Sequence, residues 1–198
     1  MEYETCEYMG YTIHVEYSHY PENPREWSNL GIMACAHRQY DLGDEDGARA
    51  LVEAVRSSRD YRPSWDRDTD WGYLPDVHQR ALQCRDIILL PLYLYDHSGI
   101  TMNTTGFTCP WDSGMVGCIF VTRAKVCEEY GVKRVSRKLR AKVEGLLRAE
   151  VDVYDAYLRG EVFTYWVEKD GETIDCVGDF YDPEECLAEA KARVLEDE

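Results

Sequence analysis

The chain has 198 residues, of which 44% are hydrophobic and 12% aromatic, and this composition excludes an intrinsically disordered protein. Its 38 acidic and 22 basic residues give a formal net charge of −16, which argues against nonspecific binding to nucleic acid or to an anionic membrane. The sequence contains no apolar stretch long enough to span a bilayer, and its first residues do not resemble a signal peptide. We therefore expect a single cytoplasmic domain over residues 1–198 that does not bind membranes.

The eight cysteines are spread along the chain, and no two lie closer than nine positions. This spacing lacks the close pairs of a zinc knuckle or a redox dithiol, so we expect reduced thiols, no metal and no cofactor. Asp66, Asp68 and Asp70 alternate like the first ligands of a calcium loop. However, Trp71 stands where that loop needs glycine, and Val77 where it needs its closing glutamate.

In chain order, the alternation of apolar and polar residues over 11–17 predicts a strand. The short apolar run 30–38 predicts a buried strand that ends in a polar pair. Helical spacing begins at Glu45, with Asp44 as the expected N-cap. Residues 60–76 are too polar and irregular for a buried element, and we expect a loop followed by a short helix to about residue 85.

The most apolar run, residues 87–95, predicts the central strand, and a second apolar run over 116–121 predicts another. Helical patterns follow over 123–130 and 136–159, and a glycine comes directly after each. Asp170-Gly171 between two strand-like runs predicts a hairpin, and Asp182 with Pro183 marks the start of a last helix.

Strands joined by hairpins, with helices between and after them, predict an α+β fold with a mainly antiparallel sheet, a long helix and several short helices. The sequence has neither the βαβ alternation of a doubly wound fold nor a glycine-rich phosphate loop. These absences argue against the usual classes of nucleotide-binding protein.

Polar residues gather where the apolar strands end. In chain order, they are His37, Arg38, Asp96, His97, Asp112 and Ser113. If the strands are neighbours, these side chains could share a cleft and supply acid–base or nucleophilic chemistry to a small hydrolase or transferase. The competing interpretation is that they form turns, in which Asp, Ser and Gly bond their own backbone.

Charge is distributed unevenly along the chain. Residues 123–148 hold nine basic and three acidic residues, so the remainder carries −22. Pairing of this basic stretch with acidic residues of the same chain or of a twin subunit would explain the uneven charge, so a homodimer is one expectation. A phosphate-binding patch is the alternative, and the overall negative charge argues against it. An acidic face can also occupy a basic groove on a partner by placing carboxylates where phosphates would lie. The residues expected to form this face, acidic side chains beside aromatic anchors, are Asp44, Glu45, Asp46, Trp65, Asp66, Asp68, Asp70 and Trp71. A solvated acidic surface without a partner is the competing interpretation.

Three segments carry a resemblance to known proteins. They are residues 27–31 with 37–44, residues 99–104 with the Cys-Pro-Trp-Asp-Ser-Gly stretch at 109–114, and residues 150–162. Together they resemble a group of small uncharacterised proteins encoded by bacteriophages and mobile elements, which implies a phage origin.

A small acidic protein of that origin is similar in character to anti-CRISPR and antirestriction proteins, which inhibit host defence complexes, sometimes as DNA mimics. This similarity leads us to expect an inhibitor that acts in the host cytoplasm without enzymatic activity. Its partner would be a host protein or ribonucleoprotein complex with a basic groove, and it would not bind nucleic acid directly. A hydrolase or transferase built on the strand-end residues is the alternative, and a phage structural or assembly protein is a third.

Overall fold

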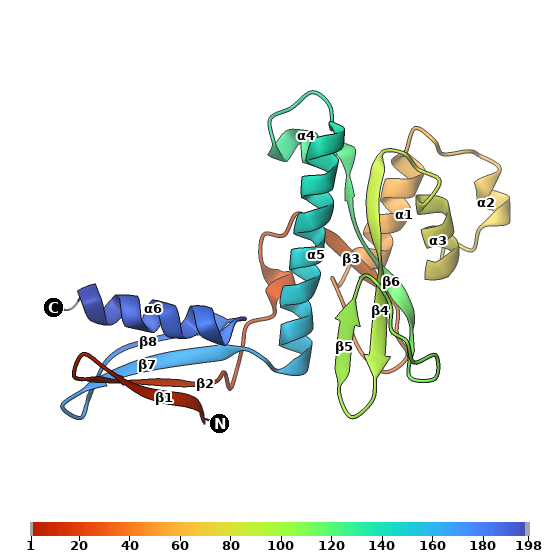
Figure 1. Ribbon diagram of the computed structural model, residues 1–198. Coiled ribbons are helices and arrows are strands. Elements are labelled where there is room, and N and C mark those ends of the chain that lie inside the picture. The colour runs from red at the N-terminus through yellow and green to blue at the C-terminus, as the bar shows by residue number, and fades with distance from the viewer. Residues whose placement is uncertain (1, 197–198) are drawn as a thin grey trace. The chain divides into compact units, whose positions relative to one another are not determined.

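The computed structural model describes residues 2–196 and shows an α+β fold with two four-stranded antiparallel sheets (Figure 1). The predicted fold class is therefore confirmed. Contacts divide the chain into two compact units. The terminal unit comprises Met1–Pro24 and Val153–Glu198, and the central unit comprises Arg25–Asp152. Whether the two units act as the single domain expected from the sequence stays a prediction.

The central unit is built around strand β6. Its strands are β3 (Ile32–Cys35), β4 (Ile87–Asp96), β5 (Ile100–Asn103) and β6 (Ser113–Thr122). Its helices are α1 (Gly47–Ser57), α2 (Trp65–Asp68), α3 (Leu74–Ala81), α4 (Arg123–Glu129) and most of α5 (Arg137–Arg159). The strand order is β3-β6-β4-β5, and neighbouring strands are antiparallel. All residues of β6 from Val116 to Val121 are buried, which explains their continuous apolar run.

Helices cover both faces of this sheet (Figure 1). On one face, Leu51 and Val55 of α1 and Val77 of α3 form a core with Ala34 and Phe120 of the strands. On the other face, α5 approaches the sheet so closely that a Cβ atom on Gly31 would lie 2.5 Å from Leu147 and 2.8 Å from Ile119. The central unit is therefore a helix–sheet–helix sandwich.

The terminal unit is a sheet covered by one helix. Its elements are β1 (Glu2–Tyr8), β2 (Tyr11–Tyr17), β7 (Phe163–Lys169), β8 (Glu172–Phe180) and α6 (Pro183–Glu196), with strand order β1-β2-β7-β8. Cys186, Ala190 and Val194 of α6 join a buried cluster with Ile13 and Tyr165 of the sheet. Asp170 and Gly171 both have positive φ, 54° and 86°, as the predicted Asp-Gly hairpin requires. The sequence does not predict β1, because its side chains are mostly exposed and four of its seven residues are Glu or Thr.

The start of α1 corrects one expectation. The N-cap position belongs to Asp46, not Asp44, and the side chain of Asp46 makes no capping hydrogen bond. Asp44 instead accepts hydrogen bonds from Arg25 Nε at 2.8 Å and from the backbone N–H of Met33 at 2.9 Å. The predicted limits of α5 hold, since Ser136 Oγ accepts a hydrogen bond from the Leu139 N–H and Gly160 has φ 70°.

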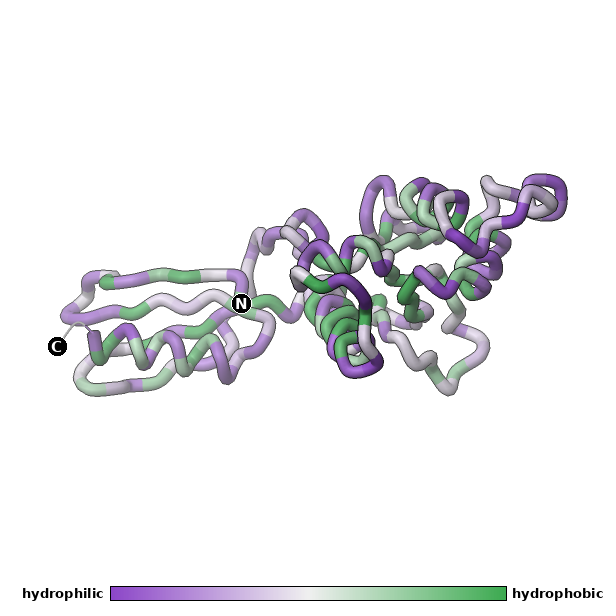
Figure 2. The backbone as a smooth tube through the Cα atoms, turned by 90° about the horizontal axis from the view of Figure 1, so that it is seen from above, coloured by the Kyte–Doolittle hydropathy of each residue, from purple (hydrophilic) through white to green (hydrophobic). Residues whose placement is uncertain are grey.

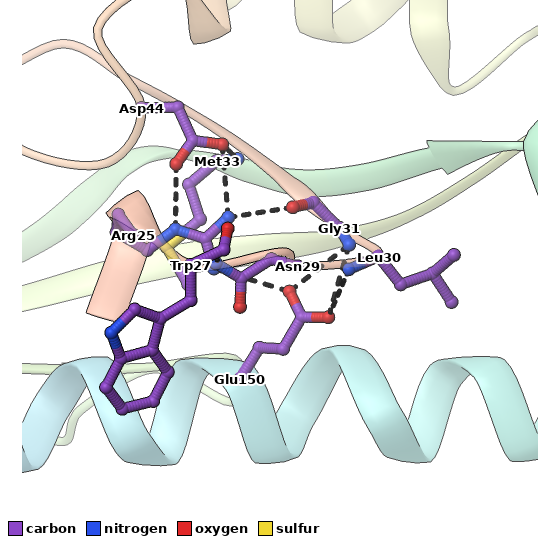
Figure 3. A network of polar contacts seen from close by, with 8 residues as sticks. All are labelled: Arg25, Trp27, Asn29, Leu30, Gly31, Met33, Asp44 and Glu150. Carbon is purple, nitrogen blue, oxygen red and sulfur yellow. Dashed lines mark hydrogen bonds and ion pairs between the residues drawn. The ribbon is translucent and has the colours of Figure 1, made fainter.

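Asp44 belongs to a buried polar network centred on Arg25, whose side chain is only 3% exposed (Figure 3). Arg25 also donates to Glu150 Oε2 at 3.3 Å and to the Gly31 carbonyl at 2.7 Å. Glu150 in turn accepts hydrogen bonds from the N–H groups of Leu30 and Gly31. Burial alone lowers the pKa of Arg25, but the hydrogen bonds and charges of Asp44 and Glu150 outweigh it and raise the pKa above its usual value. The network thus fastens the segment before β3 to helix α5.

All eight cysteines are free thiols. Burial raises the pKa of Cys35 and of Cys186 to about 12, so neither is set up as a thiolate nucleophile. Within residues 2–196, no helix combines the length and the apolar character that crossing a bilayer requires.

Candidate functional site

The strand order brings the predicted strand-end residues together. Because β3 and β4 both run antiparallel to β6, their C-terminal ends lie beside the start of β6. At this edge the Ala36 N–H donates to the Val116 carbonyl at 2.8 Å, and the Asp96 N–H donates to the Asp112 carbonyl at 2.8 Å. Strands β3 and β4 are therefore not the direct neighbours that the sequence condition required, but they flank β6 and their ends converge on its start.

A cleft of about 490 Å³ opens at this edge of the sheet, and we call it the strand-end cleft. Its walls are formed by residues 36–39, Leu94, Asp96 and residues 111–116. Five of the six predicted residues line it: His37, Arg38, Asp96, Asp112 and Ser113. The sixth, His97, does not line the cleft, but its imidazole pairs with Asp112, which does.

His97 and Asp112 form the pair best suited to acid–base chemistry. The imidazole Nδ1 lies 3.4 Å from Asp112 Oδ2, and both side chains keep access to solvent, with exposures of 64% and 40%. A carboxylate beside Nδ1 favours the tautomer with the proton on that nitrogen, which leaves Nε2 free to accept a proton from a substrate or water.

The two candidate nucleophiles near this pair are engaged elsewhere. Ser113 Oγ donates a hydrogen bond to the Cys109 carbonyl. The Cys109 thiol lies 3.7 Å from Asp112 Oδ2 and donates to it. The hydrogen bonds of both groups go to residues other than His97. The arrangement therefore suits activation of a water or a substrate hydroxyl by His97 more than attack by a protein side chain.

Two residues of the cleft wall, His37 and Asp96, contact Tyr40. The Tyr40 hydroxyl donates to Asp96 Oδ1 at 3.3 Å, and its ring stacks on His37 with centroids 5.0 Å apart. Partial desolvation, and then the charge and hydrogen bond of Asp96, raise the pKa of the Tyr40 hydroxyl. Arg38 is exposed and makes no ion pair with any described residue, so its charge is available to an anionic group.

Trp111 forms part of the cleft wall while 92% of its surface stays exposed. An indole ring in this position offers a flat face on which a planar ligand group can stack. Large exposed aromatic side chains of this kind are typical of binding surfaces.

The turn interpretation of residues 96–99 also holds. These residues connect β4 to β5, the His97 N–H donates to the Gly99 carbonyl at 3.0 Å, and Ser98 has φ 59°. This turn therefore serves the local fold, while its Asp96 lines the cleft and its His97 pairs with Asp112, another residue of the cleft wall.

The predicted acidic face is only partly present. Trp65 is a core residue with 4% exposure, and Trp71 is half-buried beneath the guanidinium of Arg56, which lies 4.5 Å from its ring centroid. Asp44 lies in the Arg25 network, so it and Trp65 are not available to a partner as expected.

The remaining acidic residues of the predicted face are exposed: Glu45, Asp46, Asp66, Asp68 and Asp70. Several have partners within the chain, such as Arg49 for Asp46 at 2.6 Å and the Tyr61 hydroxyl for Asp66 at 2.5 Å. The segment that carries α2 is mainly hydrophilic (Figure 2). This segment exposes acidic side chains, but neither of its predicted aromatic anchors, Trp65 and Trp71, is exposed.

Four residues near the cleft were not singled out as site residues from the sequence: Tyr40, His78, Cys109 and Trp111. Tyr40, Cys109 and Trp111 lie within a few positions of predicted site residues, so their proximity was a usable signal. His78 gives no such signal, because it occupies an inward position of α3 and its surroundings depend on the tertiary structure.

Comparison with protein families, with curated proteins and with solved structures finds no match to this chain.

Proposed function

We propose that this protein is a small hydrolase or transferase that acts on a polar substrate bound in the strand-end cleft. The supporting observation is the convergence of polar side chains from three separate segments on one cleft. Turn chemistry explains why Asp, Ser and Gly occur in residues 96–99 and 112–114, but it does not require the three segments to meet.

His97 acts as the general base in this proposal, and Asp112 orients it and stabilises its protonated form. Arg38 binds an anionic group of the substrate, or charge that develops on it during the reaction. Trp111 supports a planar part of the substrate. The acceptor of the transferred group is water in a hydrolase and a substrate hydroxyl in a transferase.

The proposal is tested with the full chain and three chromogenic substrates: 4-nitrophenyl acetate, 4-nitrophenyl phosphate and bis(4-nitrophenyl) phosphate. We expect turnover of at least one of them, and a fall of about 100-fold or more in kcat/KM for His97→Ala, since a general base contributes about 10²–10⁴-fold. Asp112→Asn should lower the same constant while keeping the shape of the side chain. His19→Ala removes an exposed imidazole of the terminal unit and should leave the rate unchanged.

Melting temperatures of all variants are measured alongside the rates. Loss of activity with a preserved melting temperature supports catalysis, whereas loss of both identifies His97 and Asp112 as turn formers. Turnover that survives His97→Ala, or the absence of turnover with all three substrates, would remove the catalytic proposal for these reaction classes.

A second candidate function is favoured by the distribution of charge between the two units. The terminal unit holds 19 acidic and 4 basic residues, a net charge of −15, whereas the central unit holds 19 acidic and 18 basic residues, a net charge of −1. We propose as the alternative a phage-encoded binding protein that inhibits a host CRISPR or restriction complex. The carboxylates of the terminal unit would then satisfy Lys and Arg in a basic groove of that complex.

The alternative is tested by a pull-down from bacterial lysate, with partners identified by mass spectrometry, followed by two charge-reversal variants. One variant changes Glu4, Glu185 and Glu189 of the terminal unit to Lys, and the other changes Asp66, Asp68 and Asp70 of the central unit. Each alters the net charge equally, so each controls for the other. We expect the first variant to bind the partner more weakly than the wild type. Its affinity should also depend less on salt concentration, because association is steered by charge. Unchanged affinity in both variants would exclude an acidic interface at these residues.

A further inference from the structure

His78 is an unusual core residue. Its side chain is 4% exposed, and neither ring nitrogen has a hydrogen-bond partner in the described part of the chain. Buried polar groups in native proteins nearly always have a partner, since a donor or acceptor withdrawn from water without one is costly. The absence of a partner within the described chain therefore points to a group that hydrogen-bonds this ring from an adjoining space.

Such a space exists. A cavity of about 50 Å³ has His78 in its wall, together with Leu74, Pro75 and Gly117. Its three other wall residues, Ala36, Met115 and Val116, also line the strand-end cleft. The cavity therefore adjoins the cleft, and it exceeds the roughly 15 Å³ that a single water requires.

Close approach of strands β3 and β6 shapes this corner of the cleft. A Cβ atom on Gly117 would lie 1.9 Å from the Ala34 carbonyl oxygen, so no larger residue fits there without movement of the backbone. Rigid strand backbone on one side and helix α3 on the other fix the width of the cavity. A fixed width restricts the cavity to a narrow, short group.

The chemistry of the walls restricts the occupant further. Burial lowers the pKa of His78, so its imidazole is neutral near pH 7 and offers one N–H donor and one acceptor nitrogen. Leu74, Pro75 and Val116 provide apolar walls that disfavour a charged group. A hydroxyl group can either accept from the N–H of a neutral imidazole or donate to its other nitrogen, and a short alkyl chain complements the walls.

We infer that this cavity is a subsite of the strand-end cleft that receives a short hydroxyalkyl arm of the substrate, with His78 as the residue that recognises its hydroxyl group. The inference rests on the proposed function, because the rest of the substrate would lie beside His97 and Asp112. A site built to bond a hydroxyl discriminates strongly against an analogue that lacks it, because the buried group is then left unpaired. His78 therefore determines specificity and takes no part in the reaction.

Ethanol and chloroethane are the probes for this subsite, since they have similar size and only ethanol carries a hydroxyl. Each is titrated into the full-length ¹⁵N- and ¹³C-methyl-labelled protein, and the signals of the His78 ring nitrogens and of the Leu74 and Val116 methyl groups are followed by NMR. We expect saturable binding of ethanol in the millimolar range, no tighter than about 1 mM for three non-hydrogen atoms. Chloroethane should bind about 10-fold more weakly or worse.

Two variants separate this inference from the proposed reaction. His78→Leu should abolish the preference for ethanol over chloroethane, whereas His97→Ala should keep it, because His97 lies outside the cavity. Ethanol selectivity in a protein without hydrolase or transferase activity would therefore leave the subsite standing while the proposed function fails.

The wild-type titration decides the matter even if His78→Leu does not fold. Non-saturable shifts, or equal affinity for the two probes, would show that the cavity does not recognise a hydroxyl group and would overturn the inference.

Discussion

At the scale of single residues, His78 makes a testable contribution to stability. Its folded-state pKa lies below the usual histidine value of about 6.5, and burial is the cause. The unfolded chain therefore binds a proton more readily, so the contribution is complete above about pH 6.5 and is lost as the pH falls toward the folded-state pKa.

Urea unfolding between pH 5 and 8 measures this effect. We expect the free energy of unfolding of the wild type to fall on acidification by up to about 1.4 kcal/mol per pH unit more than that of His78→Leu, since one proton is involved. Parallel pH profiles for the two proteins would show that His78 does not couple folding to pH.

The sequence predicts the residues of the candidate site better than it predicts their surroundings. His37, Asp96 and Asp112 are identifiable because each follows or precedes an apolar run, and strand ends are where a sheet delivers polar groups. Trp65 shows the opposite case. It lies among Ser, Asp and Arg, so its neighbours suggest exposure, yet the single turn of α2 directs it into the core. The direction in which a side chain points depends on tertiary packing, which a polar neighbourhood does not reveal.

At the scale of elements, long periodic segments were predictable, whereas the edge strands β1 and β5 were not. Helix α5 begins and ends where its cap and glycine predict. Strands β1 and β5 escape prediction, since an edge strand needs no continuous apolar face and β5 has only four residues. The Arg25 network is equally invisible in the sequence, because Arg25 and Glu150 are separated by 125 positions.

That network is expected to contribute strongly to the stability of the central unit. Arg25→Met leaves the carboxylates of Asp44 and Glu150 partly buried without a cation, and we expect a loss of about 3–5 kcal/mol. Arg49→Met is a matched control, because Arg49 and Asp46 are both about two-thirds exposed and such pairs contribute at most about 1 kcal/mol. Urea denaturation of both variants measures the two losses in the free energy of unfolding. Similar losses would mean that the network is no stronger than a surface ion pair.

At the scale of the whole molecule, the division into two sheets was not predictable, although the α+β class was. Strand β2 pairs with β7 across about 150 positions of sequence, and hydropathy alone does not specify such a partner. The same division reveals that the acidity of the chain is concentrated in the terminal unit. The acidic face that the sequence predicts lies instead in the nearly neutral central unit.

A net charge of −15 on the terminal unit is expected to make its stability depend on salt. Like charges repel one another in the compact state, and screening shortens the range of this repulsion from about 10 Å at 0.1 M salt to about 3 Å at 1 M. We expect NaCl over this range to slow amide hydrogen exchange in β2 and β7 more than in β4 and β6. Equal effects on the two sheets would show that the charge of the terminal unit is already balanced locally.

The terminal unit is assembled from the two ends of the chain, and this has a consequence for biosynthesis. The β1–β2 hairpin is synthesised before the central unit, but its apolar residues Tyr11, Ile13 and Val15 pack against strand β7 and helix α6, which follow the central unit in the chain. The central unit draws on one continuous stretch of chain and can complete its core earlier during translation. The nascent hairpin therefore exposes an apolar face while the whole central unit is being made, and a chaperone is expected to bind it there until β7 and α6 emerge.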